Sequence, residues 1–194
     1  MGEVVGSVGR IAVYPVKSLG GRSVPEALVD TAGLRGDRAY AVLDADTGER
    51  VTVKNTPQLA GIVATGDTEA DTITLTEVLG RPVRLVPSAA GPQVDAAAVH
   101  LVSRGAIERA TAGDVPAGCS ADDPRANLVL HLPGEADERN WVGRRLRIGE
   151  VVLDVVRTPK HCLGVYAEVQ VPGRVAAGDA VELLDSGGGA AAPA

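Results

Sequence analysis

The sequence predicts a mainly β protein with a few short helices. Valine is frequent and 24 glycines occur in 194 residues, a mixture that favours strands and turns over helices. Short apolar segments also follow one another at regular spacing with turn residues between them, as in a barrel or a sandwich. Aromatic residues make up only 2% of the chain and phenylalanine is absent, so aliphatic side chains must fill the core.

The first half of the chain is predicted to consist of short strands. They are expected at residues 4–16, 23–30, 38–43, 49–53, 59–65, 72–76 and 82–87. Thr72-Ile-Thr-Leu-Thr76 alternates polar and apolar residues, which is the pattern of a half-exposed strand. Asp44-Ala-Asp-Thr-Gly48 predicts a hairpin turn, because Gly48 can take a positive φ.

The second half is also predicted to be rich in strands. They are expected at residues 98–102, 127–132, 141–148, 151–156, 163–171 and 180–184. Ser103 is placed to cap a short helix over residues 104–112, which Gly113 would end. Residues 173–179 are expected to turn.

The domain organisation follows from a junction and a tail. Small residues with proline and glycine between 88 and 92 mark the junction, so we expect one region at 1–90 and another at 91–185. Residues 186–194 are a glycine and alanine tail with nothing to pack, and we expect disorder there.

Charge and composition exclude several classes of protein. The net charge is −6, from 19 basic and 25 acidic residues, so a broad nucleic-acid surface is not expected, although a local basic pocket for one phosphate is. Two cysteines cannot form a disulfide framework or a four-thiolate cluster. No run of about 18 apolar residues and no signal-like N-terminus occur. We therefore expect a cytoplasmic protein without membrane partners.

Cys162 is the leading candidate for chemistry. It follows a predicted strand and lies beside Arg157, Lys160 and His161. Nearby positive charge lowers the pKa of a thiol from about 8.5, and a thiolate can attack, carry sulfur or bind a soft metal. A small buried hydrophobe with ordinary basic neighbours fits the same residues, and a disulfide with Cys119 is neither required nor excluded.

Three other segments combine cations with turn residues and can hold an oxyanion. Each places its polar groups where a strand begins or ends: Lys17 and Ser18, then Asp37 and Arg38, then Arg125 and Asn127. Exposed charges at turns fit the same patterns, and a surface ion pair contributes only ~0–1 kcal/mol. His100, His131 and His161 lack metal-site spacing, and satisfied core or edge positions are expected for the first two.

Taken in order, these segments resemble the MOSC family (molybdenum cofactor sulfurase C-terminal domain). Tyr14-Pro-Val-Lys-Ser18 and Gly33-Leu-Arg-Gly-Asp-Arg38 are similar to its N-terminal β-barrel. Residues 124–129, 141–149, 157–162 and 172–179 are similar to the MOSC domain itself. The resemblance covers about residues 3–185 and implies a MOSC-type β-barrel preceded by a smaller β-barrel-like N-terminal region.

The resemblance also implies a site. In the branch that includes the amidoxime-reducing components, a molybdenum–molybdopterin cofactor (Moco) lies between the two halves, and Cys162 matches the catalytic thiolate ligand of the metal. The other implied cofactor-binding residues are Lys17, Ser18, Arg38, Ser103, Arg104, Arg125, Asn127, Lys160 and His161. Pyridoxal phosphate binding is implied as a family association only.

Two departures from the family pattern are visible. Cys162 meets Leu163-Gly-Val-Tyr166 almost directly, where relatives carry a longer segment. His161 and Ala126 stand where an arginine and a proline are usual.

Three functions follow as expectations. The resemblance implies a molybdenum-dependent oxidoreductase that reduces N-hydroxylated small molecules, with electrons from a separate iron–sulfur or flavin protein. The alternatives are a sulfur carrier with a persulfide on Cys162 and a cofactor-binding barrel without catalysis.

Overall fold

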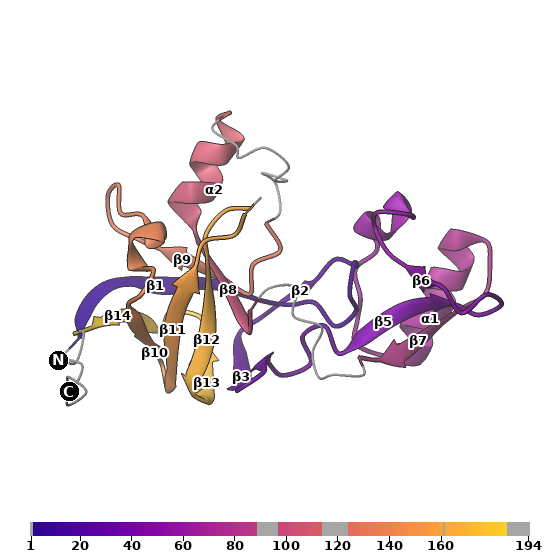
Figure 1. Ribbon diagram of the computed structural model, residues 1–194, viewed down its shortest axis with the longest axis horizontal. Helices are drawn as coiled ribbons and strands as arrows, with labels where there is room; N and C mark the ends of the chain where they lie inside the picture. Colours follow the sequence, from indigo (N-terminus) through magenta and orange to yellow (C-terminus); the bar gives the residue numbers. More distant parts are fainter. Residues whose placement is uncertain (1, 89–96, 114–123, 161, 186–194) are drawn as a thin grey trace, which may run out of the picture.

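A β barrel forms the larger part of the molecule in the computed structural model, which describes residues 2–88, 97–113, 124–160 and 162–185 (Figure 1). Among these residues seven strands pair in the order β14-β10-β11-β12-β8-β9-β1, and β1 pairs with β14 to close the ring. The strands are β1 (Glu3–Val13), β8 (Val99–Ser103), β9 (Leu128–His131), β10 (Arg145–Ile148), β11 (Val151–Arg157), β12 (Val165–Val171) and β14 (Ala180–Leu184). The prediction of a mainly β protein is confirmed.

The barrel core follows from the two-residue period of its strands. In β11, Val151, Leu153 and Val155 alternate with more exposed residues and are each at most 2% exposed. They pack with apolar side chains from every other barrel strand and with Trp141.

A helix crosses between the two strands of the parallel pair β8–β9. Parallel neighbours need such a crossover, and α2 (Arg104–Thr111) supplies it. The Oγ of Ser103 accepts a hydrogen bond from the N–H of Ala106 at 3.1 Å, so the predicted N-cap is confirmed.

A small lobe lies at the other end of the molecule (Figure 1). It contains β5 (Tyr40–Asp44), β6 (Arg50–Val51), β7 (Val83–Pro87), the 3-10 helix η1 (Pro57–Gly61) and α1 (Thr68–Leu79). The strands pair in the order β6-β5-β7 and have their own apolar core. The predicted hairpin turn is present between β5 and β6, with φ 72° at Gly48.

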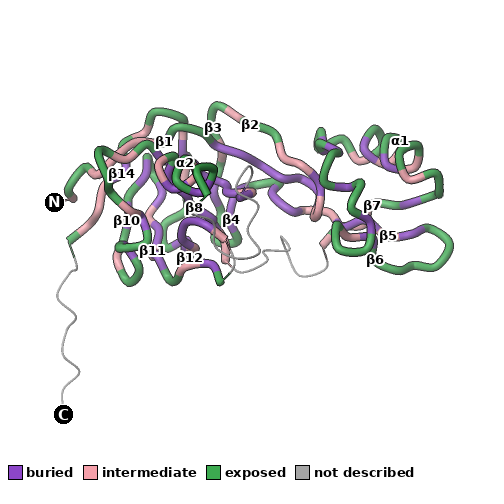
Figure 2. The backbone as a smooth tube through the Cα atoms, turned by 90° about the horizontal axis from the view of Figure 1, so that it is seen from above, coloured by how far each residue is buried: buried purple, intermediate pink, exposed green. Residues whose placement is uncertain are grey.

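The connection between barrel and lobe is buried. Residues 11–16 leave the barrel without an exposed position, and Figure 2 shows buried chain between the two parts. β2 (Arg22–Val24) returns along β1. A third sheet joins β3 (Glu26–Asp30), β4 (Gly33–Leu34) and β13 (Gly173–Ala176).

The sheet that forms the barrel therefore combines β1, and β2 at its edge, with strands from residues 99–184. The division at residues 90 and 91 stays a prediction, because it lies outside the described residues. The predicted tail at 186–194 lies outside them as well. No described helix has the length and the apolar run needed to cross a membrane.

The strand predicted at Thr72–Thr76 is wrong, because this segment lies within α1. Asp67 caps the helix by accepting the N–H groups of Glu69 and Ala70, and Gly80 ends it with φ 64°. The caps and the burial of Leu75 against the lobe core outweigh the β preference of threonine and isoleucine.

Three smaller expectations also differ from the structure. The strand predicted at 59–65 is replaced at its start by η1, whose Leu59 enters the lobe core. The segment 141–148 begins at the end of the 3-10 helix η2 (Glu138–Trp141), and β10 starts only at Arg145. The expected turn at 173–179 contains β13, which forms because residues 26–29 of β3 lie beside it.

Candidate functional site

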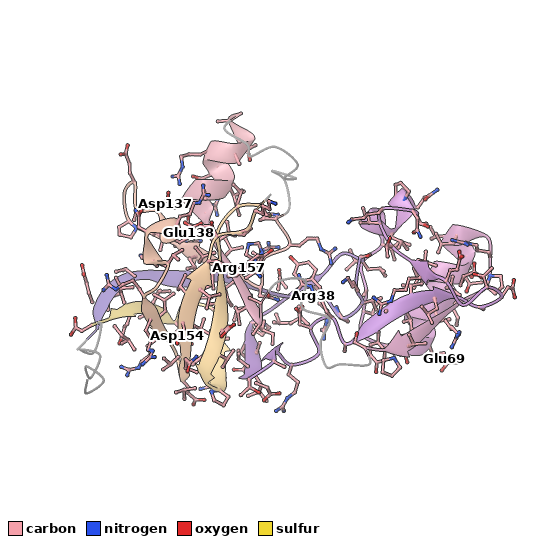
Figure 3. All side chains as sticks on the ribbon, in the orientation of Figure 1. Arg38, Glu69, Asp137, Glu138, Asp154 and Arg157 are labelled. Carbon is pink, nitrogen blue, oxygen red and sulfur yellow. The ribbon has the colours of Figure 1, made fainter. Side chains whose placement is uncertain are left out.

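A cavity of about 140 Å³ lies beside the end of the barrel that faces the small lobe. Its walls contain three residues predicted for cofactor binding together with four others: Arg38, Ala97, His100, Pro124, Arg125, Asn127 and Tyr166. Figure 3 shows Arg38 between the barrel and the small lobe. The volume equals that of about five water molecules, which suits one charged group of a larger ligand.

Arg38 is held in place by a buried carboxylate. Its Nη1 donates to Oδ2 of Asp37, whose Oδ1 accepts the N–H of Tyr14 at 2.7 Å. The residues Asp37 and Arg38 are 2% and 9% exposed, so this is not the surface ion pair considered as the alternative. Among the described residues, Nε of Arg38 has no hydrogen-bond partner, and a buried guanidinium N–H without an acceptor is suited to an incoming oxyanion.

Arg125 brings a second guanidinium to the same place. Its Cζ lies 4.7 Å from the ring centroid of Tyr14, and Cζ of Arg38 lies 5.2 Å from the same centroid. Its Nη1 donates to the carbonyl of Leu19. The tyrosine is 1% exposed, and cation–π contacts at a buried ring hold both cations. Two cations close together favour an anion between or beside them.

Backbone strain concentrates at the predicted site. Ser18, Arg38 and Arg125 have φ values of 74°, 48° and 52°, and they are the non-glycine residues with positive φ in the described parts of the chain. Such conformations cost about 1–3 kcal/mol and cluster at binding and catalytic sites. All three were predicted to bind the cofactor.

Lys17 and Ser18 follow the segment that leaves the barrel. The N–H of Lys17 donates to the carbonyl of Tyr40 at 2.8 Å, which anchors the turn to the small lobe. Arg125 reaches the carbonyl of Leu19 in the same turn, so the first and third predicted segments are joined directly.

Cys162 lies near this cavity at the end of the barrel. It is partly buried, and its Sγ lies 3.7 Å from the carbonyl oxygen of Pro124, a residue of the cavity wall. The structure thus brings the predicted thiol close to the Arg125 segment. Lys160 is exposed, and His161 and Cys119 lie outside the described residues.

Ser103 and Arg104 are not part of the cavity wall. The N–H of Ser103 donates to Oε1 of the fully buried Glu138 at 3.0 Å, and its hydroxyl caps α2. Arg104 is exposed and pairs with Glu108 at 2.9 Å. Their cofactor-binding roles stay predictions.

Sequence reasoning missed three side chains at the site: His100 and Tyr166, which line the cavity, and Tyr14, which contacts both guanidinium groups. Tyr166 lies opposite His100 on the neighbouring strand, with ring centroids 4.9 Å apart. Arg157 is paired with Tyr166 on its other side, and its Cζ is 5.3 Å from the ring centroid. Only the strand register across β11, β12 and β8 reveals this row.

His100 is a satisfied buried histidine, as the sequence suggested. Its Nε2 lies 2.8 Å from the carbonyl of Leu163. Burial lowers the pKa of the imidazole to about 4, so the ring is neutral near pH 7.

The donor set fits a molybdopterin cofactor chemically. Arg38 and Arg125 can bind an anionic phosphate, and the Cys162 thiol is a ligand that a soft metal accepts. In the described residues, no three His, Cys, Asp or Glu side chains converge as a metal-binding group.

Comparisons with known proteins identify the family and one structure of similar fold. The model of the MOSC N-terminal beta barrel domain matches residues 5–117. The YUAD protein from Bacillus subtilis is 13% identical, with a TM-score of 0.53 over 94% of this chain and 98% of that chain; this likeness shows the fold alone. YiiM from Escherichia coli is 16% identical, with a TM-score of 0.43 over 89% of this chain and 69% of that chain. No curated protein matches the sequence significantly.

Proposed function

The chain belongs to the family of the MOSC N-terminal beta barrel domain, and we propose that it binds a molybdenum–molybdopterin cofactor as a molybdenum-dependent oxidoreductase. The proposed substrates are N-hydroxylated small molecules. A separate protein of iron–sulfur or flavin type would supply the electrons. The family's association with this cofactor supports the proposal.

The observation that carries the proposal is the meeting of two guanidinium groups at one buried ring beside a thiol. Arg38 and Arg125 both lie against Tyr14, and the Sγ of Cys162 lies 3.7 Å from Pro124, the residue before Arg125. Guanidinium groups bind phosphate bidentately. Arg38 and Arg125 would therefore hold the anionic end of the cofactor, and Cys162 would hold its metal.

The bound cofactor would supply a metal that exchanges electrons and an oxygen atom. The chain's own residues would hold and orient the cofactor. Asp37 fixes Arg38 from behind and leaves Nε of that arginine for the ligand. Asn127 is already committed to the scaffold, because its Oδ1 accepts the N–H of His100 at 3.1 Å.

The test is the molybdenum and pterin content per chain after expression with molybdate. We expect near-stoichiometric metal in the wild type, loss of metal in Cys162→Ala, and loss of both metal and pterin in Arg38→Gln. Arg147→Gln is the matched control, because this exposed arginine pairs with Glu182 at 3.4 Å and should leave the content unchanged. Unchanged content in both site variants would refute the proposed site.

The reaction is then tested with protein that contains the cofactor. Reduction of a simple aryl amidoxime with a chemical electron donor should occur in the wild type and stop in Cys162→Ser. Full activity in that variant would exclude the metal-ligand role. Bound cofactor without turnover of any N-hydroxylated compound would favour a cofactor-binding barrel that does not catalyse.

A sulfur carrier is the second candidate, favoured by the partial exposure of Cys162. In this function the Cys162 thiolate would take a sulfane sulfur from a donor persulfide, whose own thiol would leave. A thiol reductant would supply the two electrons that release this sulfur as sulfide to a metal centre elsewhere and free the Cys162 thiol. Metal-free protein with a persulfide on Cys162, detected by mass spectrometry, would favour this function over the first.

A further inference from the structure

His100 connects the two segments that the proposed function uses. It is the second residue of β8 and is 6% exposed. Its Nε2 is 2.8 Å from the carbonyl of Leu163, the residue directly after Cys162. On the other side, the backbone of His100 pairs with Asn127, two residues after Arg125.

Two backbone hydrogen bonds of His100 form the connection to the segment of Arg125 and Asn127. Its N–H donates to Oδ1 of Asn127 at 3.1 Å, and its carbonyl accepts the N–H of Asn127 at 2.9 Å. Asn127 follows Arg125 by two residues and its own carbonyl accepts the N–H of Ala12 in β1 at 2.8 Å. The imidazole therefore projects from a strand that is hydrogen-bonded within the barrel, whereas Leu163 lies in the segment that connects β11 to β12.

Near pH 7 the ring is neutral, because burial lowers its pKa. Its Nε2 therefore donates to the carbonyl of Leu163. What it supplies is a donor of fixed position, packed against the ring of Tyr166.

We propose that His100 is a positioning residue, whose hydrogen bond to Leu163 holds the Cys162 thiol against the Arg125 segment. The inference rests on the proposed function in that it takes Cys162 and Arg125 as the groups to be positioned. Its test needs no cofactor, so the result can be interpreted even if the chain binds no molybdenum.

The test measures the rate at which iodoacetamide alkylates Cys162 in metal-free protein, followed by peptide mass spectrometry. A Cys119→Ser background removes the other thiol. His100→Phe keeps a ring beside Tyr166 but has no donor, and His100→Gln loses the ring but places an amide N–H near the former Nε2. His131→Phe is the control, because that histidine is exposed at the end of β9.

Cys162 in His100→Phe should be alkylated about tenfold faster, because losing one buried hydrogen bond raises the fraction of molecules in which this segment is open by that factor. His100→Gln and His131→Phe should stay within about twofold of the parent. A parent-like rate in the folded His100→Phe variant would overturn the proposal. If that variant does not fold, the glutamine variant decides, since a faster rate there would show that ring packing and not the donor holds the thiol.

Discussion

Replacing Asp37 by asparagine should destabilise the protein far more than the same change at Asp30. Both carboxylates bind an arginine, Arg38 and Arg35 respectively. The two ion pairs differ in their exposure to solvent. Side-chain exposure is 3% and 10% for Asp37 and Arg38, but 53% and 63% for Asp30 and Arg35.

The magnitude follows from what each variant leaves behind. In Asp37→Asn the side-chain carbonyl can still accept the N–H of Tyr14, so that hydrogen bond is kept. The new amide would face the guanidinium of Arg38, which becomes a buried charge without a counterion. Removing one partner of a buried ion pair costs about 3–5 kcal/mol, whereas an exposed pair contributes about 0–1 kcal/mol.

The assay is the free energy of unfolding from urea titrations of wild type, Asp37→Asn and Asp30→Asn. We expect a loss of about 3 kcal/mol for the first variant and less than about 1 kcal/mol for the second. In a domain of this size the first loss lowers Tm by about 6–12 °C. Equal losses in the two variants would refute the reasoning that burial sets the strength of the Asp37–Arg38 pair.

Three further predictions concern stability. Burial lowers the pKa of His100 from 6.5 to about 4, so between these two pH values the unfolded chain binds a proton that the folded chain does not. The free energy of unfolding is therefore highest above pH 6.5 and falls by about 3 kcal/mol as the pH falls towards 4. The unfolding free energy of wild type should therefore fall more steeply between pH 7 and pH 4 than that of His100→Phe, and parallel curves would contradict the shift. Asp67→Ala should cost about 1 kcal/mol in a urea titration, because α1 loses its N-cap; Asp67→Ser, which can still cap, should restore most of it. Gly164→Ala should cost more than about 2 kcal/mol, because φ there is 80° and a Cβ would collide with the carbonyl of Leu101; Gly36→Ala, also at positive φ but with open space, should cost less.

Local signals in the sequence predicted several elements correctly. Ser103 before a short predicted helix indicated the N-cap of α2, and Gly48 indicated a hairpin turn, because both depend on residues close in the chain. The strand predicted at Thr72–Thr76 failed although its alternation was regular. There the deciding groups were the capping Asp67 and the packing of Leu75 in the lobe core.

The candidate site was predictable only in part. Its cations, Arg38 and Arg125, stood in turn segments whose residue types suggest anion binding, and the resemblance to a family joined them with Cys162. The aromatic residues were not predictable, because Tyr14 and Tyr166 act through partners far away in the chain. Tyr14, for example, donates its hydroxyl to the carbonyl of Ala126 at 3.4 Å, across 112 residues.

By itself the sequence determined the β class, the turns, one helix cap and a set of polar residues with the chemistry to bind an anion and a soft metal. Only the tertiary structure decided which of them meet. Ring closure between β1 and β14, the pairing of β13 with β3 and the stacking of two arginines on Tyr14 depend on strand register between distant segments. Burial then changes the energy of the same groups, since removing one partner of an ion pair costs little in water but about 3–5 kcal/mol where water is excluded, as at Asp37 and Arg38.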